Sequence, residues 1–150
     1  MHCCHFYDMI DKKGWPLRCR KWPIPLHGNV LRKHACMGRN RGGVFMREFL
    51  EIRSAQDGLP LRVLVEKPQG QPLGILQLSH GMAEHKERYL PLMESLAGQG
   101  FLVAIHDHRG HGESVRSRED LGYFYENGAQ ALVEDLHQVT QLLKANYGNG

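Results

Sequence analysis

The sequence predicts an α/β fold, and three observations support this. Its 150 residues are enough for one domain with a sizeable core. Short apolar runs over 73–79 and 101–106 are typical of strands covered on both faces, as in a parallel sheet. Apolar residues recur at helical spacing over 86–99 and 128–147. Strand and helix patterns therefore alternate along the chain, which is the order of an α/β sheet.

An antiparallel hairpin is expected before this alternation begins. Residues 48–54 alternate between apolar and polar, and 60–67 is a second strand with one apolar side. Between them, Gln56-Asp57-Gly58 supplies the turn, because glycine tolerates positive φ. The apolar side of the second strand consists of Leu61, Val63 and Val65.

The next three elements form a parallel, right-handed unit of strand 73–79, helix 86–99 and strand 101–106. The helix ends near Gly98-Gln99-Gly100. Its apolar stripe consists of Tyr89, Leu92, Met93, Leu96 and Ala97.

The last helix is expected from about Gly128 to Tyr147. Asn127 as N-cap, with Gln130 three residues on, indicates a start like a capping box. Asp135 and His137 are expected at solvated positions. The expected buried stripe consists of Leu132, Val133, Leu136, Val139 and Leu143.

Residues 1–45 differ from the rest in composition. They hold nine Lys and Arg against two Asp and Glu, and all four cysteines, whereas 46–150 holds ten against fourteen. Prolines and glycines interrupt every apolar cluster, so we expect an irregular, basic, Cys/His-containing extension that is disordered or non-native, upstream of a start at Met46. Residues 46–150 are then expected to form the patterned domain of the chain.

Two alternatives for residues 1–45 remain open. One is a zinc-type site, although adjacent cysteines do not readily chelate one ion. The other is a basic tail for RNA, although its charges are scattered. We expect neither a metal nor a nucleic-acid partner. The zinc-type donors would be His2, Cys3, Cys4, His5, Cys19, His34 and Cys36.

No apolar run is long enough for a transmembrane segment, and the first residues lack the order of a secretory signal. A cytoplasmic location is therefore expected.

Two polar, glycine-containing loops follow the expected parallel strands. They are SHGMAEHKERY at 79–89 and DHRGHGES at 107–114. In open α/β sheets, ligands bind beyond the carboxyl ends of the strands, so these loops are the candidate site.

Both loops resemble those of a known family. His80-Gly81-Met82-Ala83-Glu84-His85 with Arg88-Tyr89 resembles the H-G-x-x-E-H-x-x-R-Y loop of monoacylglycerol lipases and lysophospholipases in the α/β-hydrolase family. Residues 107–114 resemble its D-x-R-G-x-G-x-S loop, and serine aminopeptidase-like hydrolases share both loops. The resemblance runs from about Met46 to the end of the chain, and it implies that residues 46–150 are a partial α/β-hydrolase domain. It implies a lipase- or esterase-type serine hydrolase acting on an acyl ester or lipid, without a cofactor.

The resemblance also implies roles for particular residues. The backbone N–H of Met82 is the expected oxyanion-hole donor. Glu84, His85 and Arg88 are either pocket residues or helix-start charges. Asp107 and Arg109 are expected to organise their loop through side chain–backbone bonds. The supporting loop residues are His80, Gly81, Glu84, His85, Asp107, Arg109, Gly110, His111, Gly112 and Ser114.

The sequence departs from the family because it contains no G-x-S-x-G nucleophile elbow. No nucleophile, triad acid or triad histidine can be assigned. We therefore expect the N-terminal half of an α/β-hydrolase sheet, truncated before the nucleophile strand and inactive by itself. In family order, strand 73–79 is then an open edge, through which the chain could associate with itself.

Other functions are not excluded at this point. The run from His106 to His111 resembles the H-x-H-x-D-H ligands of metal-dependent hydrolases, but Gly110 stands where the aspartate belongs. A non-catalytic pseudo-hydrolase fragment or binding module, and a fragment of a serine aminopeptidase-type peptidase, are the further alternatives.

Overall fold

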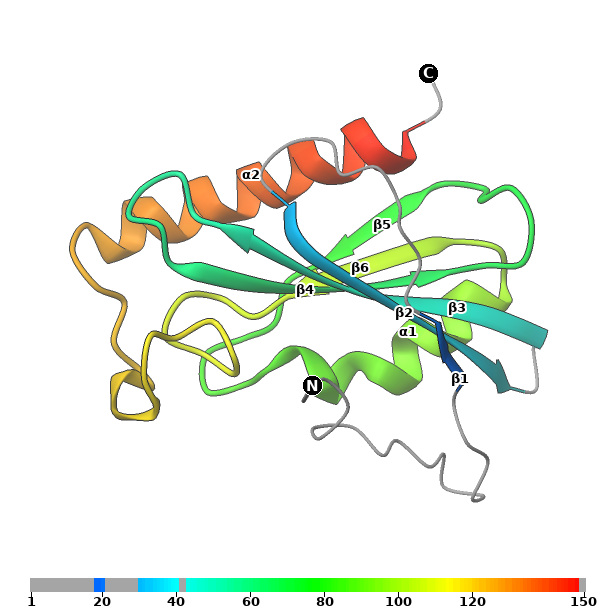
Figure 1. Ribbon diagram of the computed structural model, residues 1–150, viewed down its shortest axis with the longest axis horizontal. Coiled ribbons are helices and arrows are strands. Elements are labelled where there is room, and N and C mark those ends of the chain that lie inside the picture. Colours follow the sequence, from blue (N-terminus) through cyan, green and yellow to red (C-terminus); the bar gives the residue numbers. More distant parts are fainter. Residues whose placement is uncertain (1–17, 21–29, 41–42, 149–150) are drawn as a thin grey trace.

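The computed structural model describes residues 18–20, 30–40 and 43–148. Within them, six strands form one mixed sheet in the order β1-β2-β3-β4-β6-β5 (Figure 1). The strands are β1 (Arg18–Arg20), β2 (Val30–Asn40), β3 (Gly43–Arg53), β4 (Pro60–Lys67), β5 (Ile75–Leu78) and β6 (Leu102–His106). The helices are α1 (Leu90–Gly98) and α2 (Gly128–Tyr147), with short 3₁₀ turns η1 (Lys86–Tyr89) and η2 (Arg118–Asp120).

The predicted pairing of the patterned strands is confirmed. β3 and β4 form an antiparallel hairpin, in which Leu50 lies opposite Val63. Its turn is closed by the N–H of Gly58, which donates to the Ser54 carbonyl while Gly58 adopts a φ of +71°. β5 and β6 are parallel, as the strand–helix–strand pattern requires.

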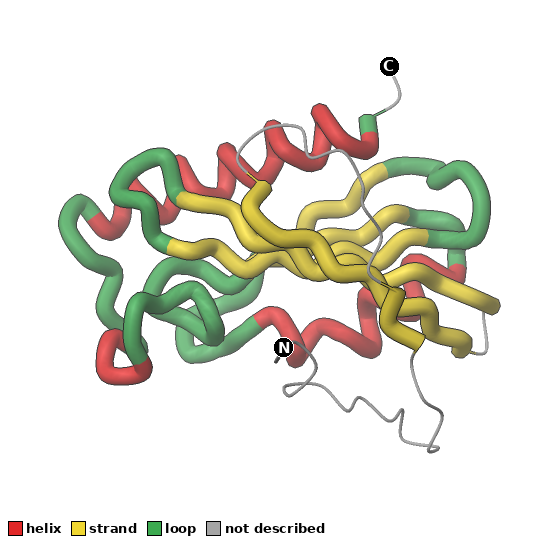
Figure 2. Tube along the Cα trace, viewed as in Figure 1, coloured by secondary structure: helices red, strands yellow, loops and turns green. Residues whose placement is uncertain are grey.

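The two helices cover opposite faces of the sheet (Figure 2). Val63, Val65 and Ala104 pack in one buried cluster with Val139 and other residues of α2. The alternate residues Leu64, Val103 and Ile105 pack in a second cluster with Met93 of α1. Successive side chains of a strand point to opposite faces of the sheet. Residues 63–65 of β4 and 103–105 of β6 therefore contribute to both clusters.

The N-terminal region departs from the sequence prediction. β2 pairs with β3 from Val30 to Asn40, where an irregular segment was expected, and β3 itself begins at Gly43, before Met46. β2 forms its backbone hydrogen bonds with β3, a long antiparallel neighbour, so it is a strand without a hydrophobic period of its own. His2 to His5 lie outside the described residues, while Cys36 is a buried residue of β2. A start at Met46 and a non-native origin of residues 1–45 stay predictions.

α2 has the predicted bounds, but its start and its buried face differ from the expectation. Asn127 adopts a left-handed conformation and its side chain caps nothing, so no capping box forms. Val133 is 57% exposed, whereas Asp135, expected in solvent, is buried. An ion pair described below explains why α2 turns an aspartate inward.

β5 is an edge strand of the sheet, and all four of its residues are only half-buried. The sequence predicted a strand covered on both faces, and that cover is incomplete because β5 pairs only with β6 among the described residues. Neither helix of the described residues has the length and hydrophobicity needed to span a membrane.

Candidate functional site

The two motif loops leave β5 and β6 at the same end of the sheet (Figure 1). They contact each other directly. The backbone N–H of His108 donates to Nε2 of His80 across 2.9 Å, and Ser79 Oγ lies 3.0 Å from Nε2 of His108. The fold therefore brings together the two loops that the sequence singled out.

Residues 81–84 form a tight turn after β5. The N–H of Glu84 donates to the Gly81 carbonyl at 3.3 Å, and the N–H of Gly81 donates to Oε2 of Glu84 at 3.0 Å. Tyr89 Oη also donates to this carboxylate, at 2.8 Å. The bond from Gly81 lowers the pKa of Glu84. Glu84 therefore closes the turn, which is a structural role that a helix-start charge would not have.

Met82 lies at the tip of this turn. Its side chain is 86% exposed, and within the described residues its backbone N–H has no hydrogen-bond acceptor. A free N–H on a fixed turn is able to stabilise an oxyanion. His85, in contrast, lies outward and pairs with Glu87 at 2.8 Å.

Lys86 fastens the first loop to the second. Its ammonium lies 2.6 Å from Asp107 and 2.7 Å from both Glu87 and Glu113, and its backbone N–H donates to Asp107 at 2.8 Å. Burial alone would lower the pKa of Lys86, but the carboxylates outweigh it and raise the pKa. Sequence reasoning missed Lys86, because the motif leaves its position unspecified.

Each fixed position of the 107–114 loop has a contact that explains it. Asp107 accepts the N–H of Glu113 at 2.9 Å, and a side chain at Gly112 would collide with the Asp107 carboxylate. A side chain at Gly110 would collide with the Tyr123 carbonyl. Ser114 is buried, and its hydroxyl accepts the N–H of Arg62 at 3.0 Å. Ser114 is thus a structural residue of the loop.

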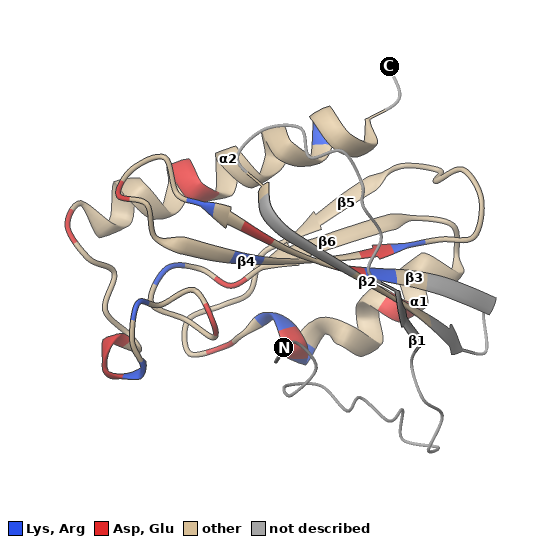
Figure 3. Cartoon of the chain, viewed as in Figure 1, with Lys and Arg blue, Asp and Glu red and all other residues tan. Residues whose placement is uncertain are grey.

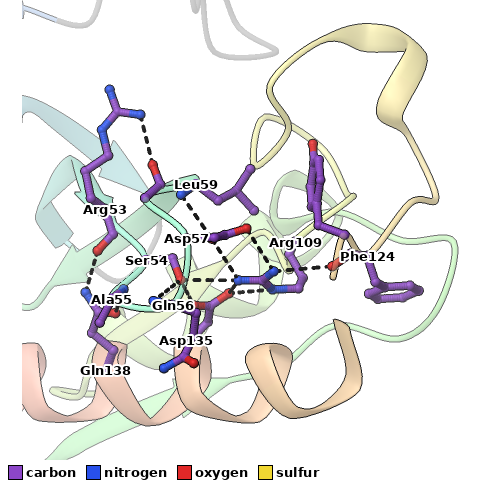
Figure 4. A network of polar contacts seen from close by, with 12 residues as sticks. Arg53, Ser54, Ala55, Gln56, Asp57, Leu59, Arg109, Phe124, Asp135 and Gln138 are labelled. Atoms are coloured by element: carbon purple, nitrogen blue, oxygen red, sulfur yellow. Dashed lines mark hydrogen bonds and ion pairs between the residues drawn. The ribbon is translucent and has the colours of Figure 1, made fainter. Parts of the chain in front are cut away.

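Arg109 is the centre of a buried ion network (Figure 4). Its guanidinium donates to Asp135 at 2.9 Å and to Ser54, Asp57 and the Phe124 carbonyl at 3.2 to 3.4 Å. Burial raises the pKa of Asp135, while bonds from Ser54 and Arg109 oppose this. Arg109 thus joins the hairpin turn, the loop and α2 mainly through side chains, where side chain–backbone bonds were expected.

Four histidine rings gather behind the loops. The ring of His80 lies 4.2 Å from His108 and 5.3 Å from His111, and His106 lies 4.9 Å from His108. Burial lowers the pKa of His106 to about 3 and that of His108 to about 4, so both are neutral at pH 7.

These histidines do not form the metal site of the alternative hypothesis. Among the described residues, the group with metal-ligand spacing is Glu87, Asp107 and Glu113, and the Lys86 ammonium lies among its oxygens. The cation that these carboxylates require is therefore supplied by the protein itself.

Ser79 and His108 lack the third member that a catalytic triad needs. Ser79 and His108 are within hydrogen-bond distance, but Nδ1 of His108 is buried without a partner, so no carboxylate orients the ring. Acidic and basic residues alternate along the sheet and loops (Figure 3). Several of them form ion pairs, such as Arg109 with Asp57 and Lys86 with Asp107.

The chain is similar to known ester hydrolases over its patterned part. Residues 70–150 match the family model described as serine aminopeptidase, S33. Monoglyceride lipase of Mus musculus is 36% identical over 91 residues, which are 61% of this chain and 28% of that protein. The chain therefore spans well under a third of the length of this curated relative.

Two solved structures share the fold. A thermostable carboxyl esterase from Bacillus coagulans, in complex with glycerol, superimposes with a TM-score of 0.60 at 28% identity. A lipase in its open form superimposes with a TM-score of 0.59 at 26% identity. Each match covers 69% of this chain and 33% of the other. With more than half of its residues matched by the family model, the chain belongs to the serine aminopeptidase S33 family, whose members have the α/β-hydrolase fold and include relatives of the monoacylglycerol lipase type.

Proposed function

We propose that this chain supplies the oxyanion-binding part of a lipase- or esterase-type serine hydrolase, with the backbone N–H of Met82 as one donor. The observation that carries the proposal is the exposed turn at Met82, whose N–H has no acceptor among the described residues. Ester cleavage builds negative charge on the carbonyl oxygen, and a donor held in place stabilises that charge without reorganising. One such donor typically contributes about 2.7–4 kcal/mol to the transition state.

The relatives support a proposal for the substrate class. Monoglyceride lipases match the sequence, and the matching esterase structure holds glycerol. We therefore propose an acyl ester of a glycerolipid, in preference to a peptide, although the family description names an aminopeptidase. A lysophospholipid is a further ester of the same chemical class.

The attacking group is proposed to lie outside this chain. The five serines of the sequence include no G-x-S-x-G elbow. Ser54 and Ser114 are buried and hydrogen-bonded, and Ser79 lacks an oriented base. The chain alone is therefore proposed to be an inactive N-terminal part of the hydrolase. The β5 edge, which pairs with no further strand among the described residues, supports self-association as a companion proposal, which a monodisperse monomer would contradict. A cytoplasmic location is also proposed.

Two measurements test the proposal. The purified chain is incubated with p-nitrophenyl butyrate and with a fluorophosphonate probe, followed by intact-mass analysis. We expect no turnover and no adduct, and an adduct on any serine would show that the nucleophile is present.

The donor is tested with the isotope-labelled chain. Butyrate, a carboxylate with the shape of a short acyl group, is titrated while amide resonances are recorded. We expect a saturable shift of the Met82 amide. A response elsewhere, with Met82 unmoved, would favour the alternative of a non-catalytic binding module.

A further inference from the structure

His80 connects the two loops through both of its ring nitrogens. Nε2 lies 2.9 Å from the backbone nitrogen of His108, and Nδ1 lies 2.8 Å from the carbonyl oxygen of Gly81. A backbone N–H can only donate, and a carbonyl can only accept. Both bonds therefore exist together only when the ring is neutral, with Nε2 bare and the proton on Nδ1.

The Gly81 carbonyl belongs to the same peptide group as the Met82 N–H. This group is planar and trans, since the described chain has no cis peptide bond, so the N–H points opposite to the carbonyl. Two donors hold the carbonyl, namely Nδ1–H of His80 and the N–H of Glu84. Fixing the carbonyl therefore fixes the direction of the Met82 N–H, and bonds to the carbonyl also polarise that N–H.

We propose that His80 is a positioning residue that aims the Met82 donor and does so only as the neutral Nδ1–H tautomer. The inference rests on the proposed function of Met82. In this state the ring holds the turn against the loop after β6, which is anchored independently through Lys86 and Asp107. The buried loop after β6 thus fixes the orientation of the Met82 N–H through His80.

A second proton on the ring would break this arrangement. Nε2–H would face the N–H of His108, so two donors would oppose each other and His108 would lose its acceptor. The titratable groups around the ring are His106, His108 and His111 from β6 and its loop, and Glu84 from its own turn. His106 and His108 stay neutral above about pH 5, because burial lowers their pKa values to about 3 and about 4.

The tautomer can be read directly in the unmodified protein. Long-range nitrogen–proton correlation spectra of the imidazole distinguish a bare Nε2 from a protonated one. We expect a bare Nε2 and a protonated Nδ1 at pH 8, and loss of the fixed Met82 N–H orientation, measured by residual dipolar couplings, as the ring of His80 takes up its second proton. An Nε2–H tautomer at pH 8 overturns the inference.

Two variants separate the two bonds. His80→Asn places an amide donor near the Nδ1 position, and His80→Gln places an amide oxygen near the Nε2 position. We expect Asn to keep the Met82 coupling while the His108 amide exchanges about tenfold faster or more, since it loses its acceptor. We expect His80→Gln to change the Met82 coupling and to leave the exchange rate of the His108 amide unchanged. His137→Asn, at an exposed position of α2, is the control and should change neither readout.

The outcomes also separate this inference from the proposed function. If His80 and its variants behave as expected but butyrate leaves Met82 unmoved, the donor role fails and the positioning geometry stands. If butyrate shifts Met82 equally in unmodified protein, His80→Gln and His80→Asn, the donor role stands and the positioning inference fails.

Discussion

The loop after β6 and the turn after β5 lie side by side, yet they differ in burial and in the bonds that hold them. From Asp107 to His111 the later loop is buried, with Arg109 fully enclosed. Gly81, Met82 and Ala83 are exposed. The buried loop is fixed by ion pairs to three other parts of the fold, whereas the exposed turn is fixed by short local bonds and by His80. The site thus combines a rigid base with an accessible donor, and the base is where mutations should cost most.

The largest expected effect is at Arg109. Arg109→Met leaves Asp135 buried without its counter-ion, so we expect the free energy of unfolding to fall by about 3–5 kcal/mol, measured by urea denaturation. Adding Asp135→Leu removes the stranded charge and should recover more than half of the loss. Arg53→Met, at a half-exposed side chain, is the control. A loss below about 1 kcal/mol for Arg109→Met would show that the network is not essential.

The next effect is at Gly112. Gly112→Ala forces a Cβ into the Asp107 carboxylate at a φ of +51°, so we expect a loss of about 2–4 kcal/mol in unfolding free energy. Gly58→Ala is the matched control, because its φ is +71° but nothing lies within 4 Å. That control should lose only about 1–2 kcal/mol. Equal losses at the two positions would mean that the Asp107 contact contributes nothing.

A pH dependence should reveal the buried histidines. Burial lowers the folded pKa of His106 to about 3, so below about pH 6.5 the unfolded chain takes up a proton that the folded chain does not. Stability is therefore lost as the pH falls. Relative to His106→Leu, the unmodified protein should lose about 2 kcal/mol between pH 7 and pH 5.

Glu66 contributes to the pH dependence of stability with the opposite sign. Its contribution is the same in the unmodified protein and in His106→Leu, so it cancels when the two are compared. Burial raises the pKa of this carboxyl to about 7, against attraction from Arg47, so its contribution to stability is lost as the pH rises through 7. His137→Leu, at an exposed position, should show no such relative shift. Parallel pH curves for the unmodified protein and His106→Leu would contradict the assignment.

The smallest effects are expected at the exposed turn. Met82→Ala should change the unfolding free energy by less than about 0.5 kcal/mol, because the side chain is almost fully exposed. It should also keep the butyrate response, since the proposed donor is the backbone. Loss of that response with unchanged stability would assign the binding to the methionine side chain instead.

Local pattern was sufficient to predict the patterned elements. Hydrophobic period and turn residues gave the β3–β4 hairpin, the parallel β5 and β6, and α2 from Gly128 to Tyr147. Two motifs, one strand–helix–strand unit apart, gave the family before any contact was known. The same reasoning did not find β2, because its pairing partner rather than its own period defines it.

The burial of particular charged residues could not be predicted from the sequence. Lys86 and Asp135 look like ordinary surface charges of a helix start and a helix face, yet both are buried. Asp135 lies four residues from both Ala131 and Val139, on the buried face of α2, but its charge alone predicted a solvated position. Its burial depends on Arg109, which lies 26 positions away, and such a partner is identified only in three dimensions.

The sequence by itself determined the α/β order, the family and the glycine-containing loops, because these depend on periodicity and on residues at fixed local spacing. Only the tertiary structure decided which charges are buried, which loop is rigid, and which histidine nitrogen faces a donor. Those properties depend on groups that are distant along the chain and adjacent in space, where desolvation makes every unpaired charge costly and so selects one partner for each.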